Sequence, residues 1–525
     1  MKLATPNEMK ILDQLAIDIY KIPGILLMEN AALNIVSKAM EMLAAAPCGG
    51  KTVVVAGKGN NGGDAYATAR HLIQKGYRVV VISLVERSRI TGDAEKFLKI
   101  LESIGASVIY AADEADIPKI KNLLYNSALI IDGIFGTGFY GSVTGIFKSV
   151  IEHINKSRAK VLSIDIPSGV NGETGQTGGI AVKADETVTF TLPKPGLFQY
   201  PGRIHAGNVT VADIGIPVAA IKQLKPDAEL VDKAFFSEHI PERIADGHKN
   251  TFGRILAITG SKGMTGAGIL TAKAAFKTGS GMVFLAVPDS LSSIYGMAIP
   301  EAITIPLKDT DGFITGENLN VLLEKSELMD TIVIGPGLSS NKQAILWVKT
   351  FVTNCKKPMV IDADALNIMA EEPDLLKTRS AATVITPHPG EFARLTGLSA
   401  DEIRADRIGL ALEFSRRWNV TVVLKGAGTV SATPTGEYYI NSTGNPVLSV
   451  AGSGDVLAGI IGSLMGQGVK HDIASALGVY IHGMCGDILA AGCNRQAGFT
   501  AGEICDKIPF AMGGTNGRHF HEYKA

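Results

Sequence analysis

Short apolar runs alternate with helical patterns along almost the whole chain. In the first half, the predicted strands are residues 52–56, 78–84, 107–110, 128–132, 160–165, 187–192 and 208–213. This alternation predicts a parallel, doubly wound α/β sheet, because strands that run parallel need a crossover connection, usually a helix. Ligands of such sheets bind beyond the carboxyl ends of the strands, so the residues that follow each strand form the candidate site.

A helix is expected near residues 7–20, and the alternation lapses in a connector at 216–232 before it restarts at Gly253. Further strands are predicted at 253–260, 281–287, 331–334, 358–362, 382–386, 420–425 and 438–441, and two long helical patterns follow Asp455. A chain of 525 residues is too long for one hydrophobic core. We therefore predict two domains, residues 1–220 and 226–512, and a polar tail at 513–525 that is poorly ordered.

Charge and composition exclude several classes of protein. The formal net charge is −1, and nothing indicates a nucleic acid or an anionic membrane as partner. No apolar run approaches the ~20 residues of a membrane span, and the N-terminus lacks a signal-peptide core. The cysteines are Cys48, Cys355, Cys485, Cys493 and Cys505. They show no metal-binding spacing, so reduced thiols in the cytoplasm are expected.

The turn GNNGGD, residues Gly59–Asp64, lies between a predicted strand and a helical pattern. A glycine-rich turn of this kind lets backbone N–H groups approach a ligand at the start of the helix. Here Asn60, Asn61 and Asp64 add two amides and a carboxylate. A turn that binds only phosphate does not need these polar side chains.

Asp132 and Asp165 also end predicted strands, and they lead into the loop Gly136–Ser142 and to Ser168. A carboxylate at a buried strand end costs several kcal/mol unless it is paired or binds a metal. Oxygen ligands of this kind suit an alkali or alkaline-earth ion and not zinc. The alternative is that each aspartate only caps the turn that follows it.

In the second half, the sequence GSGD at 452–455 opens a predicted helix. Free N–H groups at a helix start can hold a phosphoryl group, and Asp455 can take the proton of a substrate hydroxyl. Lys425–Thr429 is interpreted as a nucleotide loop. Other candidate turns are 260–267, 335–337, 362–367 and 386–391.

Plain structural roles remain open for several of these residues. His388 lies between two prolines and could be a hydrogen-bonded loop residue, and Asp362 and Asp364 could cap the next helix. Lys425 could be a strand-end cation. His519 and His521 are interpreted as solvated tail residues.

The motifs GNNGGD, GIFGTG and SIDIPSGVNGETG together resemble the NAD(P)H-hydrate epimerase domain. The motifs GSKGMTGA, GPGL, DADALN, TPHPGE, KGAGT and AGSGD resemble the ADP-dependent NAD(P)H-hydrate dehydratase domain, which has a ribokinase-like fold. The resemblance covers nearly the whole chain, in the order of the fused repair enzymes. Sugar kinases usually carry GAGD, whereas this chain has GSGD, as the dehydratases do. The fold class implied is α/β, with a Rossmann-like doubly wound domain followed by a ribokinase-like domain.

The resemblance also implies site residues. In the epimerase domain, the hydrated nucleotide would be bound by Asn60, Asn61, Gly62, Gly63, Asp64, Gly136, Thr137, Gly138, Phe139, Tyr140, Gly141 and Ser142, with Asp165 as the acid and base. Potassium would be bound by Asn61, Asp132 and Ser168. In the dehydratase domain, Ala267, Gly337, His388 and Asp455 would contact the hydrated cofactor. ADP would be bound by Lys425, Gly426, Ala427, Gly428, Thr429 and Gly454.

The implied function is repair of hydrated NADH and NADPH. The R and S hydrates would be epimerised, and the S form would be dehydrated with ADP and Mg²⁺, giving NAD(P)H, AMP and phosphate. A homotetramer is also implied. One alternative is a ribokinase-like vitamin-precursor kinase fused to a nucleotide-binding module. Another is that the first half is a non-enzymatic nucleotide-sensing module. The sequence indicates no preference between NADH and NADPH. The preference for ADP over ATP rests on the resemblance alone.

Overall fold

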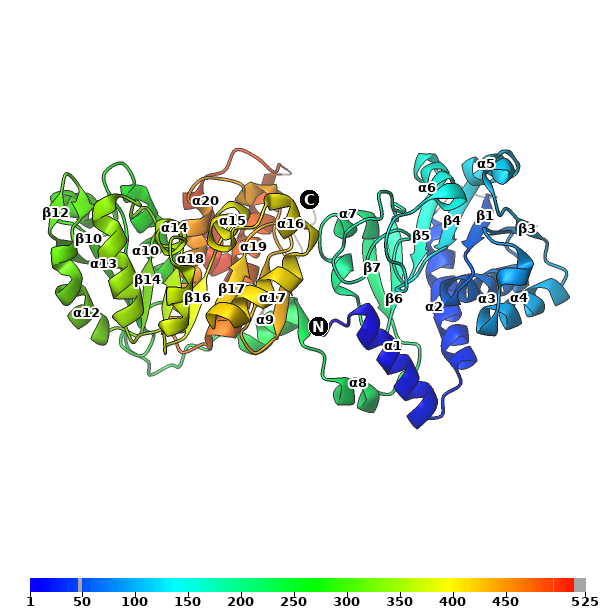
Figure 1. The fold of residues 1–525 in the computed structure, drawn as a ribbon, viewed down its shortest axis with the longest axis horizontal. Coiled ribbons are helices and arrows are strands. Elements are labelled where there is room, and N and C mark those ends of the chain that lie inside the picture. Colours follow the sequence, from blue (N-terminus) through cyan, green and yellow to red (C-terminus); the bar gives the residue numbers. More distant parts are fainter. Residues whose placement is uncertain (46–49, 494, 514–525) are drawn as a thin grey trace. The chain divides into compact units, whose positions relative to one another are not determined.

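The computed structural model describes residues 1–45, 50–493 and 495–513, which fall into two compact units (Figure 1). One unit is Lys2–Ala228, and the other consists of Met1 and Glu229–Ala525. Each unit is built around its own large sheet. Cys48, His519 and His521 lie outside the described residues, as does the predicted tail apart from Gly513.

The first unit has a seven-stranded sheet in the order β3-β2-β1-β4-β5-β6-β7, and every neighbouring pair is parallel. Its strands are β1 Lys51–Ala56, β2 Val79–Ser83, β3 Val108–Tyr110, β4 Ser127–Gly133, β5 Lys160–Ile164, β6 Glu186–Phe190 and β7 Asn208–Ala212. The predicted doubly wound sheet is therefore confirmed. The strand order reverses between β1 and β4, where this fold leaves a crevice at the carboxyl ends.

Helices cover both faces of this sheet (Figure 1). They are α1 Pro6–Gln14, which continues as the π-helix η1 Leu15–Ile19, α2 Gly24–Ala44, α3 Asn60–Gln74, α4 Gly92–Ser103, α5 Ile117–Tyr125, α6 Gly145–Lys156, α7 Gly202–Ala206 and α8 Val218–Leu224. Along β1, Val54 and Ala56 belong to one apolar cluster, while Val53 and Val55 belong to another. Because successive side chains point to opposite faces, burial on both sides explains the uninterrupted apolar run in this strand.

The second unit has a ten-stranded sheet in the order β11-β10-β9-β14-β15-β16-β17-β18-β19-β8. Its strands are β8 Ala228–Val231, β9 Arg254–Ile258, β10 Met282–Pro288, β11 Ile303–Leu307, β14 Thr331–Ile334, β15 Met359–Ile361, β16 Thr383–Ile385, β17 Thr421–Leu424, β18 Val430–Ala432 and β19 Tyr438–Asn441. The sheet is parallel from β11 to β17, and β18 and β19 join it antiparallel. β12 Asp309–Thr310 and β13 Phe313–Ile314 form a separate hairpin.

The sequence prediction missed five of these strands: β8, β11, β12, β13 and β18. The predicted connector at 216–232 contains the boundary between the two units, and it also contains α8 and β8, which were not predicted. A strand of four residues such as β8 is too short to show a clear period, and only its pairing at the sheet edge defines it.

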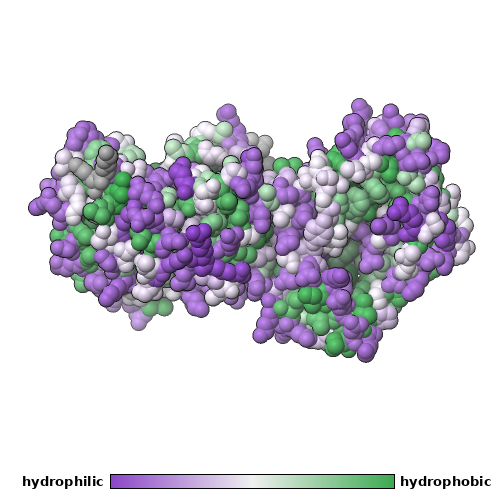
Figure 2. Space-filling view, in the orientation of Figure 1, coloured by the Kyte–Doolittle hydropathy of each residue, from purple (hydrophilic) through white to green (hydrophobic). Residues whose placement is uncertain are grey.

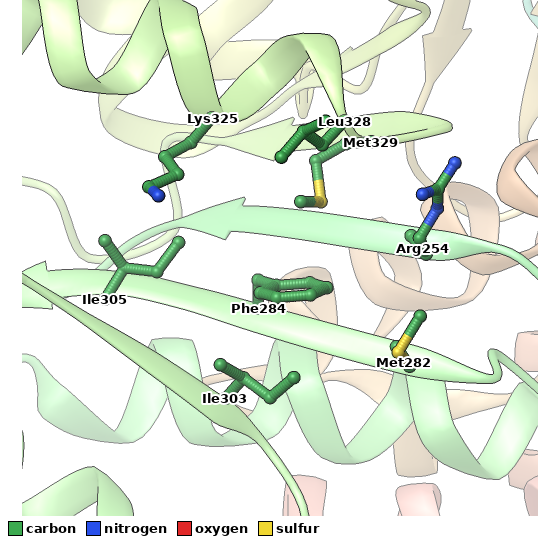
Figure 3. Close-up of a pocket in the computed structure, with 8 residues that line it drawn as sticks. All are labelled: Arg254, Met282, Phe284, Ile303, Ile305, Lys325, Leu328 and Met329. Carbon is green, nitrogen blue, oxygen red and sulfur yellow. The ribbon is translucent and has the colours of Figure 1, made fainter. Parts of the chain in front are cut away.

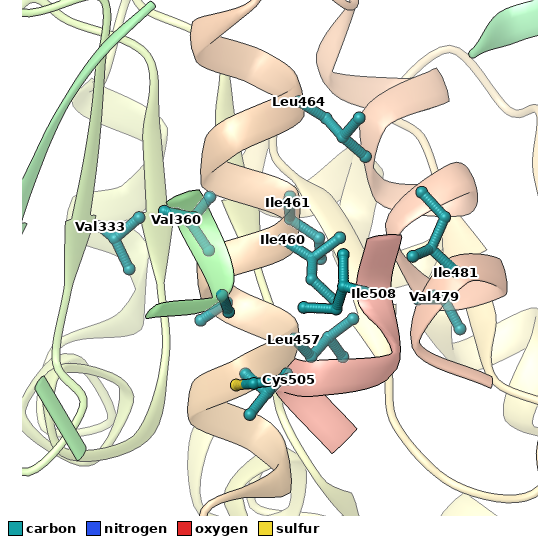
Figure 4. Packing of buried hydrophobic residues seen from close by; sticks show 14 of the residues in the cluster. Val333, Val360, Leu457, Ile460, Ile461, Leu464, Val479, Ile481, Cys505 and Ile508 are labelled. Carbon is teal, nitrogen blue, oxygen red and sulfur yellow. The ribbon is translucent and has the colours of Figure 1, made fainter. Parts of the chain in front are cut away.

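The helices of the second unit are α9 Lys233–His239, α10 Thr265–Thr278, α11 Ser292–Ala298, α12 Leu319–Glu327, α13 Lys342–Asn354, α14 Ala363–Met369, α15 Pro389–Thr396, α16 Ala400–Ala405, α17 Arg407–Trp418, α18 Ser453–Gly466, α19 His471–Cys493 and α20 Ala501–Gly513. Helix α18 is central. Leu457 and Ile461 belong to the same buried cluster as Val333 of the sheet and Ile508 of α20 (Figure 4). A Cβ at Gly459 would lie 2.3 Å from the Thr271 carbonyl oxygen, so α18 packs very closely on α10.

One described helix, α19, is long and apolar enough to cross a membrane by length and composition alone. However, 72% of its most apolar window is buried inside the protein, as in a core helix. Figure 2 shows polar residues interspersed with small apolar patches on the visible face of each unit.

Candidate active sites

The turn GNNGGD forms the start of α3, directly beyond the end of β1. A Cβ at Gly62 would lie 2.1 Å from the Gly57 carbonyl oxygen, so only glycine lets the helix begin this close to the strand. The Asn61 side-chain amide donates to the Phe135 carbonyl oxygen at 2.8 Å. The turn after β1 is thereby tied to the loop after β4.

Asp132 lies at the centre of the same strand ends and is fully buried. Its carboxylate accepts from the Ser168 hydroxyl at 2.5 Å, the Ser168 backbone N–H at 2.9 Å and the Ser163 hydroxyl at 2.9 Å. Burial raises the pKa of Asp132, and the hydrogen bonds from Ser168 oppose that shift. Ser168 Oγ also accepts from the Phe135 N–H at 2.8 Å. Asn61, Asp132 and Ser168 are the three residues predicted to bind potassium. Asn61 and Ser168 both bind the Phe135 backbone, and Ser168 also binds Asp132, so the three are linked.

Asp165 follows β5 with a left-handed φ of 63°, a strained conformation for a non-glycine residue. The Lys194 ammonium donates to its carboxylate at 2.5 Å, and the Thr189 hydroxyl does so at 3.1 Å. Lys194 is only 1% exposed, so this is a buried ion pair. The sequence analysis missed Lys194, although its position just after the predicted strand 187–192 was the same signal that identified Asp165.

Two further carboxyl groups lie within electrostatic reach of Asp165. Asp64 is 7% exposed and has no hydrogen-bond or ion-pair partner in the part of the chain that the structure describes. Burial, and then the charges of Asp165 and Asp13, raise the pKa of Asp64 well above its usual value. Burial likewise raises the pKa of Asp13, on α1, to about 6. Nothing in the sequence pattern of α1 distinguished Asp13, since only the tertiary fold brings it here.

The glycine-rich loop Gly136–Ser142 is the more exposed side of this site. A Cβ at Gly136 would lie 3.2 Å from that of Asn61, so the loop begins against the GNNGGD turn. Phe139 stacks on Phe135 at a ring-centroid distance of 5.0 Å, whereas Tyr140 is largely exposed.

In the second unit, the start of α18 meets the ends of β15 and β17. Asp362 follows β15 and accepts from the Lys425 ammonium at 2.8 Å and from the Thr386 hydroxyl at 2.7 Å. Lys425, after β17, also lies 3.7 Å from the Glu391 carboxylate. A Cβ on Gly454 would lie 3.4 Å from the Lys425 Nζ. The predicted nucleotide lysine and the GSGD turn are therefore neighbours.

The electrostatics of this site favour proton transfer by Asp455. Burial first, and then the Asp362 charge, raise its pKa to about 7, with Lys425 opposing the shift. Burial alone would lower the pKa of Lys425, but attraction to Asp362 and Glu391 outweighs it and the pKa is raised. The site therefore holds a cation beside a carboxyl group that changes protonation near neutral pH.

The remaining predicted residues of this unit are placed as follows. His388 caps α15: its Nδ1 accepts from the Gly390 N–H at 3.0 Å, and its side chain is half exposed. A Cβ at Gly337 would lie 2.8 Å from that of Ala267, so these two residues are in contact. Asp362 occupies the N-cap position of α14, but its carboxylate makes no capping hydrogen bond there and instead pairs with Lys425.

The loop Lys425–Thr429 is a tight turn, with φ of 144° at Gly426 and 66° at Gly428. The Thr429 hydroxyl donates to the Gly426 carbonyl oxygen at 2.7 Å. Arg407, which the sequence analysis missed, donates from Nη2 to the Leu424 carbonyl oxygen at 2.9 Å. Burial lowers its pKa to about 10. Arg407 thus binds the end of β17, at the point where the loop begins.

A cavity of about 310 Å³ lies at the opposite end of this sheet (Figure 3). It is lined by Arg254, Met282, Phe284, Ile303, Ile305, Lys325, Leu328 and Met329. Arg254, Met282 and Ile303 are the first residues of β9, β10 and β11, whereas the predicted site residues follow strand ends. None of the predicted site residues lines this cavity.

Comparison with known proteins covers nearly the whole chain. The family profile described as NAD(P)H-hydrate dehydratase matches residues 255–509, and that described as YjeF-related protein N-terminus matches residues 25–196. The bifunctional NAD(P)H-hydrate repair enzyme of Moorella thermoacetica is 41% identical over 513 residues, which is 98% of this chain and 97% of the relative. That of Thermofilum pendens is 37% identical over 98% of this chain and 96% of the relative.

A similar solved structure is the ADP/ATP-dependent NAD(P)H-hydrate dehydratase of Bacillus subtilis, co-crystallised with ATP and Mg²⁺. It is 28% identical, covers 55% of this chain and 98% of its own, and has a TM-score of 0.47. The two profiles fall one in each unit. Because the full-length relatives match from end to end, this chain belongs to the family of bifunctional NAD(P)H-hydrate repair enzymes.

Proposed function

We propose that the first unit interconverts the R and S hydrates of NADH and NADPH, and that the second unit dehydrates the S hydrate with ADP. The products are NAD(P)H, AMP and phosphate. The observation that carries this proposal is the position of Asp455, which has a pKa of about 7 and lies at a helix start beside the Lys425–Asp362 pair. We place the reaction in the cytoplasm, in a homotetramer without nucleic acid or membrane partners.

Dehydration begins with phosphoryl transfer, which is catalysed by residues of the second unit. Asp455 takes the proton of the C6 hydroxyl as that oxygen attacks the terminal phosphorus of ADP, and the bond from phosphorus to AMP breaks. Lys425, Gly426, Ala427, Gly428, Thr429 and Gly454 hold the nucleotide, and Ala267, Gly337 and His388 contact the hydrated cofactor. The ring nitrogen then expels phosphate from C6, and loss of the C5 proton restores the double bond.

Phosphorylation favours dehydration because it replaces hydroxide with a better leaving group. Water has a pKa of ~15.7, whereas the second pKa of a phosphate group is near ~6. Phosphorylation therefore improves the leaving group by roughly ten pKa units, equivalent to at most about 13 kcal/mol. This explains why a dehydratase needs a phosphoryl-transfer site.

Mg²⁺ neutralises phosphate charge during such transfers. The described residues contain no cluster of three or more His, Cys, Asp or Glu side chains suited to a metal. Mg²⁺ in phosphoryl-transfer sites is commonly bound by substrate phosphates and retained waters, with one or two carboxylates. We therefore assign it no protein ligands.

The dehydration reaction is expected to depend on pH through Asp455. Because this carboxyl must be ionised to accept a proton, and its pKa is about 7, kcat/KM should fall about tenfold per pH unit below that value. The check is kcat/KM for the S hydrate between about pH 5.5 and 8.5, a range that brackets the pKa of Asp455. A flat profile across this range would remove Asp455 from its role as the base.

Epimerisation needs proton transfer at the C6 oxygen and at the ring nitrogen. Asp165, which is paired with Lys194, accepts the hydroxyl proton while Asp64, whose pKa is raised, protonates the ring nitrogen. The C6–N bond opens to an aldehyde, and closure on its other face inverts C6. The loop Gly136–Ser142 and residues 60–63 hold the rest of the nucleotide.

The residues around Phe135 fit a potassium ion. The Asn61 amide donates through its nitrogen, which leaves its oxygen as a ligand, and Ser168 and Asp132 supply hydroxyl and carboxylate oxygens. These are the hard oxygen donors that alkali ions take. When bound, K⁺ would hold the loops after β1, β4 and β5 together and offset the Asp132 charge.

Removal of potassium is therefore expected to lower epimerisation and leave dehydration of the S hydrate unchanged. Dialysis into a lithium or tetramethylammonium buffer tests this, because neither ion matches potassium in size. Epimer exchange would be followed by NMR, and readdition of K⁺ should restore it. Equal rates with and without K⁺ would contradict the site.

One assay decides between this function and a vitamin-precursor kinase. Mixed hydrate epimers are incubated with ADP and Mg²⁺, and the nicotinamide absorbance is followed to completion. Full conversion, with AMP and phosphate in equal amounts, supports both proposed activities. Conversion of the S form alone would leave only the dehydratase. A stable phosphorylated vitamin alcohol, detected by mass spectrometry, would support the kinase.

A further inference from the structure

The helix that carries Asp455 begins without a side-chain cap. Its N-cap is Gly452, with φ of 86°, and a Cβ there would lie 2.5 Å from the Leu270 side chain. A side-chain cap typically contributes about 1 kcal/mol to a helix. The Ser453 N–H donates to the Val450 carbonyl oxygen at 3.2 Å, whereas the Gly454 and Asp455 N–H groups have no acceptor within the described segments. They remain available for an anion, but the first turn lacks the bond that usually fixes it.

A buried contact ties this first turn to the protein interior. Ser453 Oγ lies 3.0 Å from Nε2 of His482, which comes from the middle of α19. The Thr271 hydroxyl, on α10, lies 3.3 Å from the Asp455 carbonyl oxygen, but the Ala267 carbonyl oxygen is a nearer acceptor at 2.9 Å. Ser453 is 6% exposed and His482 is 8% exposed, so their contact is shielded from water. A hydrogen bond in such surroundings is costly to lose, because neither partner can turn to solvent.

His482 is poorly suited to any role as an acid, a base or an anion-binding cation. Burial lowers its pKa to about 4, and the nearby Lys425 charge acts in the same direction. The ring is therefore neutral at pH 7, and its contact with Ser453 is a neutral hydrogen bond.

We propose that His482 is a positioning residue for dehydration, which acts through Ser453 to fix the first turn of α18. This turn presents the Gly454 and Asp455 N–H groups and the Asp455 carboxylate to the phosphoryl group. The inference rests on the proposed dehydratase function. It also gives a reason for serine in GSGD: an alanine at 453 would leave the buried imidazole nitrogen without a partner.

Four variants test the pair. His482→Leu and Ser453→Ala are each expected to lower kcat/KM for ADP about tenfold, the scale of one lost buried hydrogen bond. The double variant should be no worse than either single one, because both remove the same contact. His482→Gln keeps a polar nitrogen near the position of Nε2 and should recover most of the activity. The acid limb of the pH profile should stay near pH 7 in every variant, since Asp455 sets it.

Several controls separate this proposal from simple destabilisation. Epimerisation, carried by the other unit, is measured on the same preparations, and thermal unfolding is recorded for each variant. If His482→Leu fails to fold, the smaller Ser453→Ala change decides. Unchanged kcat/KM for ADP in a folded Ser453→Ala variant, or additive losses in the double variant, would overturn the proposal. If the wild-type protein does not dehydrate the hydrate, the result contradicts the proposed function, whereas the outcomes above contradict the positioning role of His482 and Ser453.

Discussion

Replacement of Asp455 by Asn is expected to lower ADP-dependent dehydration by about 10²–10⁴-fold, the usual contribution of a general base. Asparagine has nearly the same shape, but it cannot take the proton of the substrate hydroxyl. Asp455 belongs to the second unit, so epimerisation should be unchanged. NADH formation from the S hydrate is followed by absorbance, and epimer exchange is followed by NMR.

A matched control for this variant is Asp401→Asn. Asp401 has a side chain that is 91% exposed and forms a surface ion pair with Arg404. The substitution makes the same change of charge in the same unit and should leave both activities as they are. Dehydration that survives Asp455→Asn at the wild-type rate would show that another group removes the proton.

Replacement of Asp165 by Asn is expected to lower epimerisation by about 10²–10⁴-fold while dehydration of the S hydrate persists. The variant also leaves the Lys194 ammonium buried without its carboxylate. Breaking a buried pair in this way typically costs about 3–5 kcal/mol of stability. Epimer exchange is measured by NMR, and unfolding is measured by denaturant titration of the first-unit transition.

The double variant Asp165→Asn with Lys194→Met separates catalysis from stability. Methionine fills a similar volume without charge, so most of the lost stability should return. Epimerisation should remain at the low level of the single variant. Recovery of epimerisation together with stability would mean that Asp165 acts only through the fold, and that the proposed base lies elsewhere.

Much of the fold could be predicted from the sequence because burial on both faces leaves a strong pattern. β15 and the last four residues of β1 are continuous apolar runs that are followed by a polar residue or a glycine turn, and the alternation of such runs with helical patterns predicts the α/β class. The short strands β8 and β18 were not found, because pairing and not composition defines them. The long helix α2 was not predicted either, although Gly24–Ala44 includes a largely buried apolar face.

The sequence by itself determined which residues lie at or just after the strand ends. It therefore predicts that Asp132, Asp165 and Lys425 lie at the carboxyl ends of the strands in the two sheets. It also determined that Asp455 begins a helix, because a glycine turn before an apolar helical pattern is a local signal. Only the tertiary structure decided the partners of these groups. Lys194, Asp13 and His482 come from segments distant in sequence, and their effect on Asp165, Asp64 and Ser453 depends on burial. Charges and hydrogen bonds become strong only when folding removes water from around them, and no local pattern records which groups will share that space.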